Sequence, residues 1–354
     1  HKFLRPQSAR LVGAKEDEVV VMNTLTTNLH LLMVSFYRPT PQRYKIIMEA
    51  GAFPSDQYAM ETQVKWHGFD PAEAIVEVAP RAGEETLRSE DIIETIKKHG
   101  EQTAVVMFGG VNYYTGQFFD LAAISKAAHD VGAYAGFDLA HAAGNLPLKL
   151  HDWEVDFACW CSYKYLNSGP GAVSGVFVHE RHVRDANGQG TAMRRLEGWW
   201  GHDAESRFQM DPEFVPMPSA EAWQMSNAPV LNMAVHKVAL DLFVEAGMPA
   251  LRERSLRLTA YLEELVHAVA ERTGANLEIL TPSEPTARGC QLSVVAHGYG
   301  RSLFEHLMQH GVIVDWREPA VIRMAPVPLY NSFEDLVRFA QVLEEGLREL
   351  GHAG

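Results

Sequence analysis

The sequence has 354 residues, of which 47% are hydrophobic and 21% charged, a composition typical of a globular protein with a large core. Acidic residues outnumber basic ones by 45 to 31, and the net charge of −14 argues against binding to nucleic acids or anionic membranes. No apolar run reaches the roughly 18 residues that span a bilayer, and three cysteines are too few for a disulfide framework. We therefore expect a cytoplasmic globular protein of about two domains, and neither a disordered, a secreted nor a membrane protein.

Short β-branched runs alternate with helical stretches along the first two-thirds of the chain. Six runs are predicted to be strands: residues 18–22, 44–48, 104–108, 133–137, 157–161 and 173–178. Ser89 and Asp120 are candidate N-caps of helices that end at Gly100 and Gly132. Strands that alternate with helices of this length predict an α/β fold with a mostly parallel sheet covered by helices on both faces.

The regular pattern lapses between about residues 181 and 218, where glycines and prolines accompany Trp199 and Trp200. We interpret this segment as a long connection that contains functional loops. A helix over 256–272 follows, and Ser332 with Asp335 forms a capping box for the last helix. Further strands are predicted at 277–280, 291–296, 312–316 and 321–325. The predicted organisation is a large domain over residues 1–210, then a connecting helix and a smaller α/β domain over 211–354.

The most informative segment is Cys161-Ser-Tyr-Lys-Tyr-Leu-Asn-Ser-Gly-Pro-Gly, which brings Lys164 to a turn at the end of an apolar strand. A lysine seldom ends a buried run unless it is paired or used chemically. Desolvation can lower the pKa of such an amine and make it nucleophilic toward a carbonyl. The alternative is a lysine that simply leaves the strand for solvent.

A carboxylate and a histidine, Asp138 and His141, follow the strand predicted at 133–137. The carboxyl ends of parallel strands meet at one edge of the sheet, so Asp138 and Lys164 are expected at the same crevice. A carboxylate opposite a lysine suits pyridoxal phosphate, because it keeps the pyridine nitrogen protonated and the ring electron-withdrawing. Alternatively, Asp138 caps a helix and His141 is a buried, hydrogen-bonded histidine.

Two further loops at this edge could hold such a cofactor. The strand at 18–22 is followed by a helix start rich in Thr and Asn, where backbone N–H groups near Leu25 and Thr26 could bind the phosphate with the Tyr163 phenol. After the strand at 44–48, Phe53 could stack on the ring, with the Asp56 carboxylate beside it. The alternatives are an ordinary polar helix cap and simple packing of a Phe-Pro turn.

Arg323 lies within a β-branched strand near the end of the chain. A guanidinium group in an apolar strand needs a carboxylate partner, either an amino-acid substrate or an internal Asp or Glu. Metal and nucleotide binding are poorly supported. Cys159-Trp-Cys161 and His179-Glu-Arg-His182 lack zinc-site spacing, and the sequence has no GxGxxG motif and no P-loop.

Taken together, these segments resemble the kynureninase family, pyridoxal-phosphate enzymes of fold type I, the aspartate-aminotransferase fold. The resemblance extends along nearly the whole chain. Its most specific stretches are Asn28-Leu-His-Leu-Leu-Met, Phe53-Pro-Ser-Asp, Gly83-Glu-Glu-Thr-Leu-Arg, Tyr114-Thr-Gly-Gln, Phe137-Asp-Leu-Ala-His, Leu150-His-Asp-Trp, Asp156-Phe-Ala-Cys-Trp-Cys-Ser-Tyr-Lys-Tyr-Leu-Asn and Arg323-Met-Ala-Pro-Val-Pro-Leu-Tyr-Asn.

The resemblance implies a role for each matching position. Lys164 would bind the cofactor covalently and carry protons together with Tyr163, while Arg323 would bind the substrate carboxylate. Asp138, helped by Asp56, would hold the pyridine nitrogen. The residues implied to contact the cofactor are Leu25, Thr26, Phe53, Asp56, Asp138, His141, Tyr163, Lys164, Trp199 and Asn227.

The resemblance also implies an activity and an assembly. The reaction would be hydrolysis of L-kynurenine or 3-hydroxykynurenine to L-alanine and anthranilate or 3-hydroxyanthranilate, in tryptophan catabolism and NAD biosynthesis. Trp199, Ser226 and Asn227 would contact substrate in the neighbouring subunit, which implies a homodimer with two shared sites.

Two departures from the family pattern stand out. The family's N-terminal segment, which supplies a substrate-contacting histidine, is expected to be largely missing. Gly109 stands where some members have a serine, so one hydroxyl near the cofactor is absent or replaced by backbone or water. The competing hypotheses are a cysteine desulfurase or class V aminotransferase, and an inactive kynureninase-like dimer that serves as a binding protein or scaffold.

Overall fold

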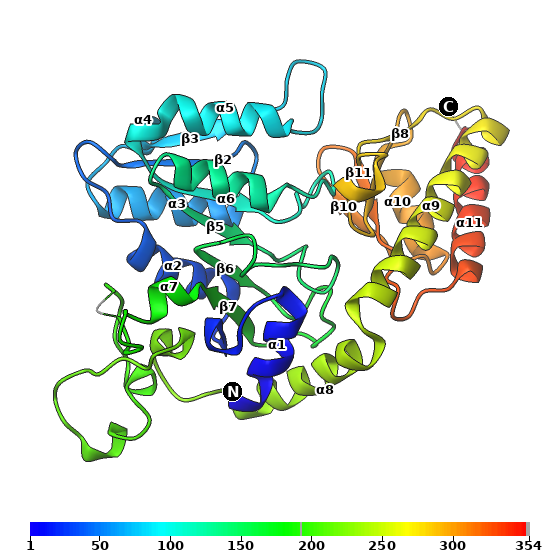
Figure 1. Cartoon of the computed structure of the whole chain (residues 1–354). Coiled ribbons are helices and arrows are strands. Elements are labelled where there is room, and N and C mark those ends of the chain that lie inside the picture. Colours follow the sequence, from blue (N-terminus) through cyan, green and yellow to red (C-terminus); the bar gives the residue numbers. More distant parts are fainter. Residues whose placement is uncertain (192, 352–354) are drawn as a thin grey trace. The chain divides into compact units, whose positions relative to one another are not determined.

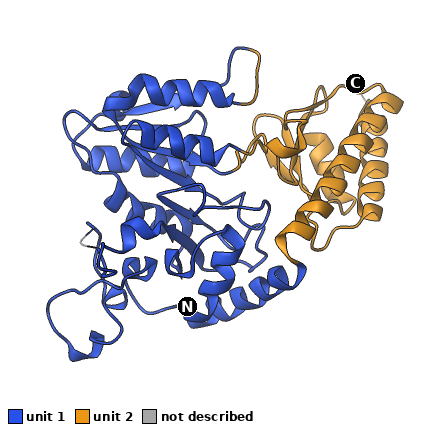
Figure 2. Cartoon of the chain, in the orientation of Figure 1, with its two compact units in different colours: residues 1–82, 87–110, 119–246 blue, residues 83–86, 111–118, 247–354 orange. Residues whose placement is uncertain are grey.

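The computed structural model describes residues 1–191 and 193–351, which form two compact units (Figure 2). The first unit comprises residues 1–82, 87–110 and 119–246, and the second comprises residues 83–86, 111–118 and 247–354. Among the described residues, no helix is both long and apolar enough to cross a membrane.

The first unit is built on a seven-stranded sheet with the order β1-β7-β6-β5-β4-β2-β3 (Figure 1). Strands β6, β5, β4, β2 and β3 run parallel, whereas β7 is antiparallel to both of its neighbours. The strand bounds are β1 Val19–Met22, β2 Lys45–Glu49, β3 Ile75–Val78, β4 Thr103–Gly109, β5 Tyr134–Asp138, β6 Phe157–Trp160 and β7 Ser174–Val178. The predicted mostly parallel sheet is confirmed.

All six strands predicted for this part of the chain are present, each within a few residues of its expected bounds. Strand β3, at the edge of the sheet, was not predicted from the sequence. Its residues are largely half-buried and it includes the exposed Glu77, so it lacks the continuous apolar run of the central strands.

Helices of the first unit alternate with its strands along the chain. Their bounds are α1 Arg5–Val12, α2 Leu25–Phe36, α3 Pro54–Trp66, α4 Pro71–Ala74, α5 Ser89–His99, α6 Leu121–Asp130, α7 Glu180–Val183 and α8 Val230–Ala246. The Asp120 carboxylate caps α6 by accepting a hydrogen bond from the Ala123 N–H at 2.9 Å, as predicted. Ser89 does not cap α5: it is the first helical residue, and Arg88 occupies the N-cap.

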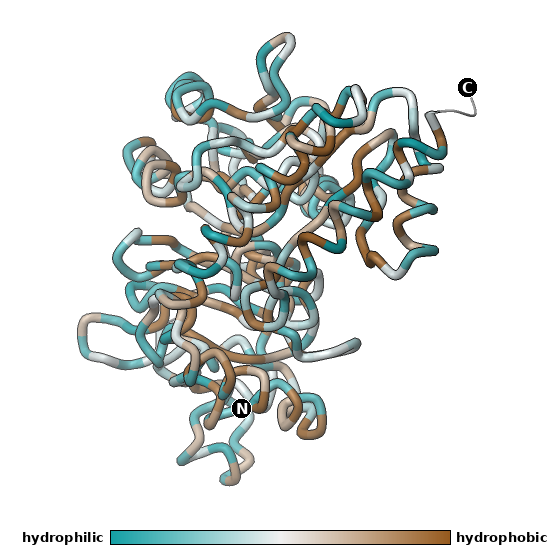
Figure 3. Tube along the Cα trace, turned by 90° about the vertical axis from the view of Figure 1, so that its right-hand side faces the viewer, coloured by the Kyte–Doolittle hydropathy of each residue, from teal (hydrophilic) through white to brown (hydrophobic). Residues whose placement is uncertain are grey.

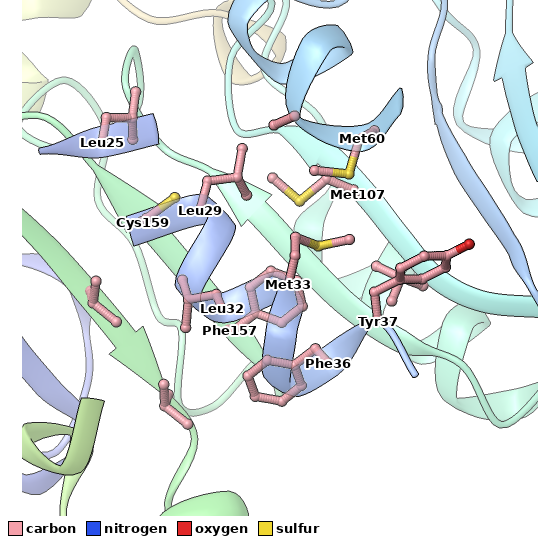
Figure 4. Close-up of a cluster of buried hydrophobic side chains, with 14 of the residues drawn as sticks. Leu25, Leu29, Leu32, Met33, Phe36, Tyr37, Met60, Met107, Phe157 and Cys159 are labelled. Carbon is pink, nitrogen blue, oxygen red and sulfur yellow. The ribbon is translucent and has the colours of Figure 1, made fainter. Parts of the chain in front are cut away.

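The main core of the first unit lies between α2 and the sheet (Figure 4). Leu29, Met33 and Phe36 lie on one face of α2, at the i, i+4 and i+7 spacing that an amphipathic helix buries. The Phe36 ring stacks on that of Phe157 in β6 with 4.5 Å between the centroids. This packing fixes the direction of α2, and therefore the place where its N-terminus lies.

The second unit contains a four-stranded antiparallel sheet with the order β10-β11-β9-β8. Its element bounds are α9 Met248–Thr273, β8 Leu277–Ile279, β9 Leu292–Ala296, α10 Gly300–Gln309, β10 Asp315–Arg317, β11 Val321–Met324 and α11 Phe333–Gly351. The predicted capping box is present, because Ser332 N–H donates to Asp335 Oδ2 at 2.8 Å and Asp335 N–H donates to Ser332 Oγ at 3.2 Å. The alternation of apolar and polar residues along the helices can be followed in Figure 3.

The irregular segment predicted between 181 and 218 holds α7 and two short 3-10 turns, η4 Trp199–Gly201 and η5 Arg207–Gln209. The predicted domain boundary after residue 210 differs from the division between the compact units, because α8 groups with the first unit. It does so because it packs against α1 and hydrogen bonds to it through Gln7 and Asp241. The first unit therefore ends at Ala246.

A buried carboxylate, Asp156, joins two helices to the amino end of β6. It accepts hydrogen bonds from His129 of α6 at 2.8 Å and from His182 of α7 at 2.7 Å, and it pairs with Arg181 at 2.6 Å. Burial alone would raise the pKa of Asp156, but the hydrogen bonds from both histidines and the Arg181 charge hold it well below its usual value.

We expect Asp156→Asn to lower the free energy of unfolding at pH 7 by about 3 kcal/mol, because it leaves a guanidinium without its charged partner. A carboxylate with a depressed folded-state pKa stabilises the protein above its unfolded value of 3.8, and this contribution is lost as the pH falls below that value. The difference between wild type and variant in urea unfolding should therefore shrink below pH 4.

Asp130→Asn is the matched control, since Asp130 makes only an exposed i,i+4 pair with Lys126. It should cost under about 0.5 kcal/mol. Equal losses in the two variants would contradict the role of Asp156.

Candidate functional site

Acidic side chains gather at the carboxyl edge of the central strands of the first unit. Asp138 is the last residue of β5, and Glu49 is the last residue of β2; both are buried. Between these strands, β4 ends at Gly109, which pairs with Asp138 in the sheet register and donates its N–H to Glu49 Oε1 at 3.1 Å. A parallel sheet brings these ends together because its strands all point the same way.

Asp138 and Asp56 form a hydrogen-bonded carboxyl pair. Asp56 lies in the first turn of α3, and Asp138 also accepts the N–H of Ala140 at 2.7 Å. Burial is the main cause of the raised pKa of each group, and the Asp138 and Glu49 charges raise the pKa of Asp56 further. The hydrogen bonds from Ala140 and Asp56 favour the charged form of Asp138, so the pair holds a proton on Asp56 and a carboxylate on Asp138.

Lys164 lies beside this pair, on the turn that follows β6. Its Nζ is 3.3 Å from Nε2 of His141 and 5.5 Å from the centroid of the Phe53 ring. The lysine charge acts on both carboxyl groups and opposes the effect of burial on their pKa values. Of the two interpretations of Lys164, the structure supports a paired lysine within a cluster, and the interpretation as a solvent-directed residue is wrong.

Tyr163 and two thiols line the same edge. The pKa of Tyr163 is raised to about 12 by partial burial and by the hydrogen-bonded Cys161. Burial likewise raises the pKa of the Cys159 thiol, and it raises that of Cys161 despite the nearby lysine. The phenol therefore stays protonated near neutral pH and can donate a hydrogen bond, whereas both thiols are inert as nucleophiles.

Two helix N-termini meet near these residues. Leu25 and Thr26 are the first two residues of α2, and Ser55 is the second residue of α3. The hydroxyls of Thr26 and Ser55 are 2.6 Å apart and join the two helix starts. Free backbone N–H groups and the helix dipole make such a position favourable for an anion, and two hydroxyls add donors.

These features fit pyridoxal 5'-phosphate. The group needs an amine for its aldehyde, a carboxylate for its pyridine nitrogen, a flat apolar face and a cradle for its phosphate. Lys164, Asp138, Phe53 and the Thr26–Ser55 pair offer one of each within the same unit. A buried carboxylate such as Asp138 gains a cationic partner when a protonated pyridine binds, which offsets the cost of its burial.

The sequence analysis missed two members of this cluster, Glu49 and Ser55. Glu49 carries the same signal as Asp138, a carboxylate that ends an apolar strand, so the pattern could have found it. Ser55 carries no signal of its own, since only the meeting of two helix starts gives it a neighbour.

Arg323 lies in β11 of the second unit. It donates to the Tyr113 carbonyl at 2.5 Å and pairs with Asp315 of the neighbouring strand β10. Of the two partners that the sequence analysis left open, the structure shows the internal carboxylate. Asp315 also pairs with Arg317 at 2.8 Å, so it is shared between two guanidinium groups.

Three further residues predicted for the site, Trp199, Ser226 and Asn227, lie outside the cluster around Lys164. Trp199 is half-exposed, and its ring packs edge-on against Phe208 at 5.4 Å between centroids. Ser226 and Asn227 are exposed and precede α8. Among the described residues, none of the three forms a hydrogen bond or ring contact with Lys164.

Among the described residues, one group of side chains has metal-ligand chemistry, at the opposite end of the first unit's sheet. It consists of Glu18, His151 and His179, whose ligand atoms lie within 4.8 Å of one another. The Glu18 Oε1 atom already accepts from His151 at 2.8 Å and from the Glu180 N–H at 2.9 Å. His179 caps α7 by accepting the N–H of Arg181 at 3.3 Å. The Glu18 and His179 atoms that could bind a metal therefore already take part in hydrogen bonds that hold the local structure.

Solved structures with the same fold define the class of this protein. A cysteine desulfurase from Thermococcus onnurineus NA1 superposes with a TM-score of 0.77 at 16% identity, covering 99% of this chain and 84% of that one. The cystine C–S lyase C-DES, in complex with cysteine persulfide, gives 0.79 at 17% identity over 97% and 86% of the chains. A variant of C-DES carries glycine covalently linked to its pyridoxal-phosphate cofactor. The fold is therefore that of the pyridoxal-phosphate enzymes of fold type I.

Sequence comparisons identify the family within this class. Residues 251–343 match the kynureninase C-terminal domain. Kynureninases from Myxococcus xanthus and Flavobacterium psychrophilum are 57% and 56% identical over 349 and 348 residues, or 99% and 98% of this chain and 80% of each relative. The chain belongs to the kynureninase family, and its cofactor is pyridoxal 5'-phosphate.

We expect Asp138→Asn to reduce turnover by roughly 10³-fold, because an amide cannot supply the negative charge that keeps the pyridine nitrogen protonated. Turnover at saturating cofactor and the visible absorption of the holoenzyme measure the effect. Asp156→Asn is the control, since it removes a buried carboxylate from the opposite end of the sheet. Unchanged turnover in Asp138→Asn would contradict the assignment.

Proposed function

We propose that the kynureninase reaction of this chain takes place at the carboxyl edge of the first unit's sheet, with Lys164 as the cofactor-binding amine. The reaction is hydrolysis of the Cβ–Cγ bond of L-kynurenine or 3-hydroxykynurenine, which yields L-alanine and anthranilate or 3-hydroxyanthranilate. The observation that carries the proposal is the contact of Lys164 with His141 and Phe53 beside the buried Asp56–Asp138 pair.

Bound pyridoxal phosphate withdraws electrons from the substrate α-carbon, which permits the bond changes at Cα and Cβ. Asp138 would accept a hydrogen bond from the protonated pyridine nitrogen, and Asp56 would keep the carboxylate in place. Phe53 would cover one face of the ring. The α2 N-terminus at Leu25 and Thr26 would bind the phosphate together with Tyr163.

The side chain of Lys164 changes role during the reaction. It would hold the cofactor before substrate arrives, and during turnover its amine would take the proton from the substrate Cα. His141, 3.3 Å away, orients this amine. The Tyr163 phenol stays protonated because its pKa is raised to about 12, so it can donate a proton as water adds to the γ-carbonyl and the Cβ–Cγ bond breaks.

Arg323 is proposed to bind the substrate carboxylate. Its pairing with Asp315 keeps the guanidinium oriented within the second unit's sheet. A substrate carboxylate would compete with Asp315, which is itself shared with Arg317 and half-exposed. Because Asp315 is partly exposed to solvent, breaking its ion pair with Arg323 costs little free energy.

The cysteines argue against a desulfurase reaction, even though solved desulfurases share the fold. Such a reaction needs a nucleophilic thiolate on a mobile loop. Cys159, Cys161 and Cys290 are all buried, and burial raises the pKa of the first two thiols. These three cysteines, which are not in disulfides, also favour a reducing compartment, and we propose that the enzyme works in the cytoplasm, in tryptophan catabolism and NAD biosynthesis.

We also propose a homodimer, in which Trp199, Ser226 and Asn227 reach the partner's active site. Helix α8 supports this assembly with an exposed apolar stripe at i, i+4, i+7 and i+11: Leu231, Val235, Val238 and Leu242, which are 52–82% exposed. Phe208 and Met210 are exposed as well. Apolar stripes of this kind are unusual on the surface of monomers and are typical of subunit interfaces.

Reduction of the holoenzyme with borohydride should fix the cofactor on the peptide that contains Lys164, as read by mass spectrometry. Lys164→Arg keeps the charge but cannot form the link, so it should release no fluorescent anthranilate from L-kynurenine. Lys126→Arg is the control, because Lys126 makes only a surface pair with Asp130. Cofactor attached to another lysine would contradict the proposal. The ratio of kcat/KM for the two substrates measures the preference between them.

The double substitution Val235→Lys and Leu242→Lys should convert the dimer to monomers in light scattering, because a two-fold interface places the new charges near one another. The control is Lys237→Gln, which lies on the same helix away from the stripe and pairs only with Asp241. A wild-type protein that is monomeric at micromolar concentration would overturn the dimer.

A further inference from the structure

The turn that carries Lys164 is closed by hydrogen bonds of its own backbone. Asn167 N–H donates to the Lys164 carbonyl at 3.0 Å, and Ser168 N–H donates to the Ser162 carbonyl at 2.9 Å. Asn167 has a φ of 57°, a left-handed conformation that a residue other than glycine adopts only when its surroundings hold it there. The position of the lysine backbone therefore depends on what fixes Ser168.

Ser168 is fixed by a buried histidine of α8. Its Oγ lies 2.7 Å from Nδ1 of His236, and the two residues are 3% and 0% exposed. One helical turn earlier, Asn232 Nδ2 donates to the Gly171 carbonyl at 2.6 Å. Two side chains of α8 at i and i+4 thus hold the segment 168–171, which follows the lysine turn.

The hydrogen bond at Ser168 has a defined direction. Burial lowers the pKa of His236 to about 4, so near neutral pH the ring is uncharged and carries one N–H. Nε2 has no hydrogen-bond partner among the described residues, whereas Ser168 Oγ is also 3.4 Å from the Leu166 carbonyl. With its proton on Nδ1, His236 donates to Ser168, and Ser168 donates to Leu166. This arrangement leaves a lone pair at Nε2 and avoids an unpaired buried N–H.

We propose that His236 is a positioning residue for the reaction, since its hydrogen bond to Ser168 holds the turn that places the Lys164 amine. The inference rests on the proposed role of Lys164. It adds a residue that touches neither cofactor nor substrate and acts through the backbone between Lys164 and Ser168.

Three variants separate positioning from general stability. Ser168→Ala and His236→Leu each remove the hydrogen bond, from opposite sides. His236→Asn keeps an amide near the place of Nδ1 and should restore it. The matched control is Ser35→Ala, which removes a serine hydroxyl from another buried bond of the same unit, the one from Trp223 Nε1 at 2.9 Å.

Three measurements are made on each protein: the rate at which the apoprotein captures pyridoxal phosphate, the pH midpoint of the visible absorption, and kcat. Loss of one buried hydrogen bond corresponds to roughly a tenfold effect, so Ser168→Ala and His236→Leu should slow capture and lower kcat by about tenfold and shift the midpoint. The double variant should be no worse than either single one, because both remove the same bond. His236→Asn and Ser35→Ala should stay within about twofold of wild type.

The proposal is overturned if Ser168→Ala matches the wild type in all three measurements, or if Ser35→Ala loses as much as Ser168→Ala. If His236→Leu fails to fold, the proposal is tested by the other two variants: Ser168→Ala should be impaired, and His236→Asn should resemble the wild type. A failure of the proposed function looks different, because the wild type would then carry no cofactor on Lys164. Backbone amide exchange at Asn167 and Ser168 in the apoprotein would still report whether the hydrogen bond holds the turn.

Discussion

The active site proposed for this protein depends on a charge balance at one edge of a mostly parallel sheet. Three carboxyl groups, on Glu49, Asp56 and Asp138, are buried there, and burial pushes the pKa of Asp56 and Asp138 upward. The charge of Lys164, the proton shared by Asp56 and Asp138, and a few backbone N–H groups offset the free-energy cost of burying these carboxyl groups. A cationic pyridine ring would complete the balance, and that is why this edge suits its cofactor.

The fold creates this edge through strand direction and helix packing. Strands β2, β4 and β5 end at the same edge of the sheet, so residues as far apart in the sequence as Glu49 and Asp138 are brought to one edge. The packing of α2 on β6 then sets the N-terminus of the helix beside that of α3, where Thr26 and Ser55 meet. The proposed phosphate site is thus a consequence of core packing at Phe36 and Phe157, at the far end of the helix.

Much of this was predictable from the sequence, for physical reasons that differ among residues. The strand that ends at Asp138 and the strand that precedes Lys164 are continuous apolar runs, so their ends could be located and the shared edge inferred. Glu49 had the same signal and was overlooked. The contact of Ser55 with Thr26 and the bond from His236 to Ser168 could not be predicted, because each joins segments that lie far apart in the sequence and that no local pattern connects. An internal carboxylate partner of Arg323 was one of two predicted alternatives, and the pairing of β10 with β11 identifies it as Asp315. The role of Ser89 as an N-cap was wrong because a serine before an apolar stripe suits both the cap and the first helical position.

Two faces of helix α8 make different contacts. One carries the apolar stripe from Leu231 to Leu242, and the other holds the lysine turn through His236 and Asn232. A rigid helix of 17 residues transmits a displacement of one face to the other. Binding of a second copy to the stripe would therefore change the position of the Lys164 amine. Dilution below the dissociation constant of the proposed dimer would then reduce specific activity by more than the loss of the partner's residues alone.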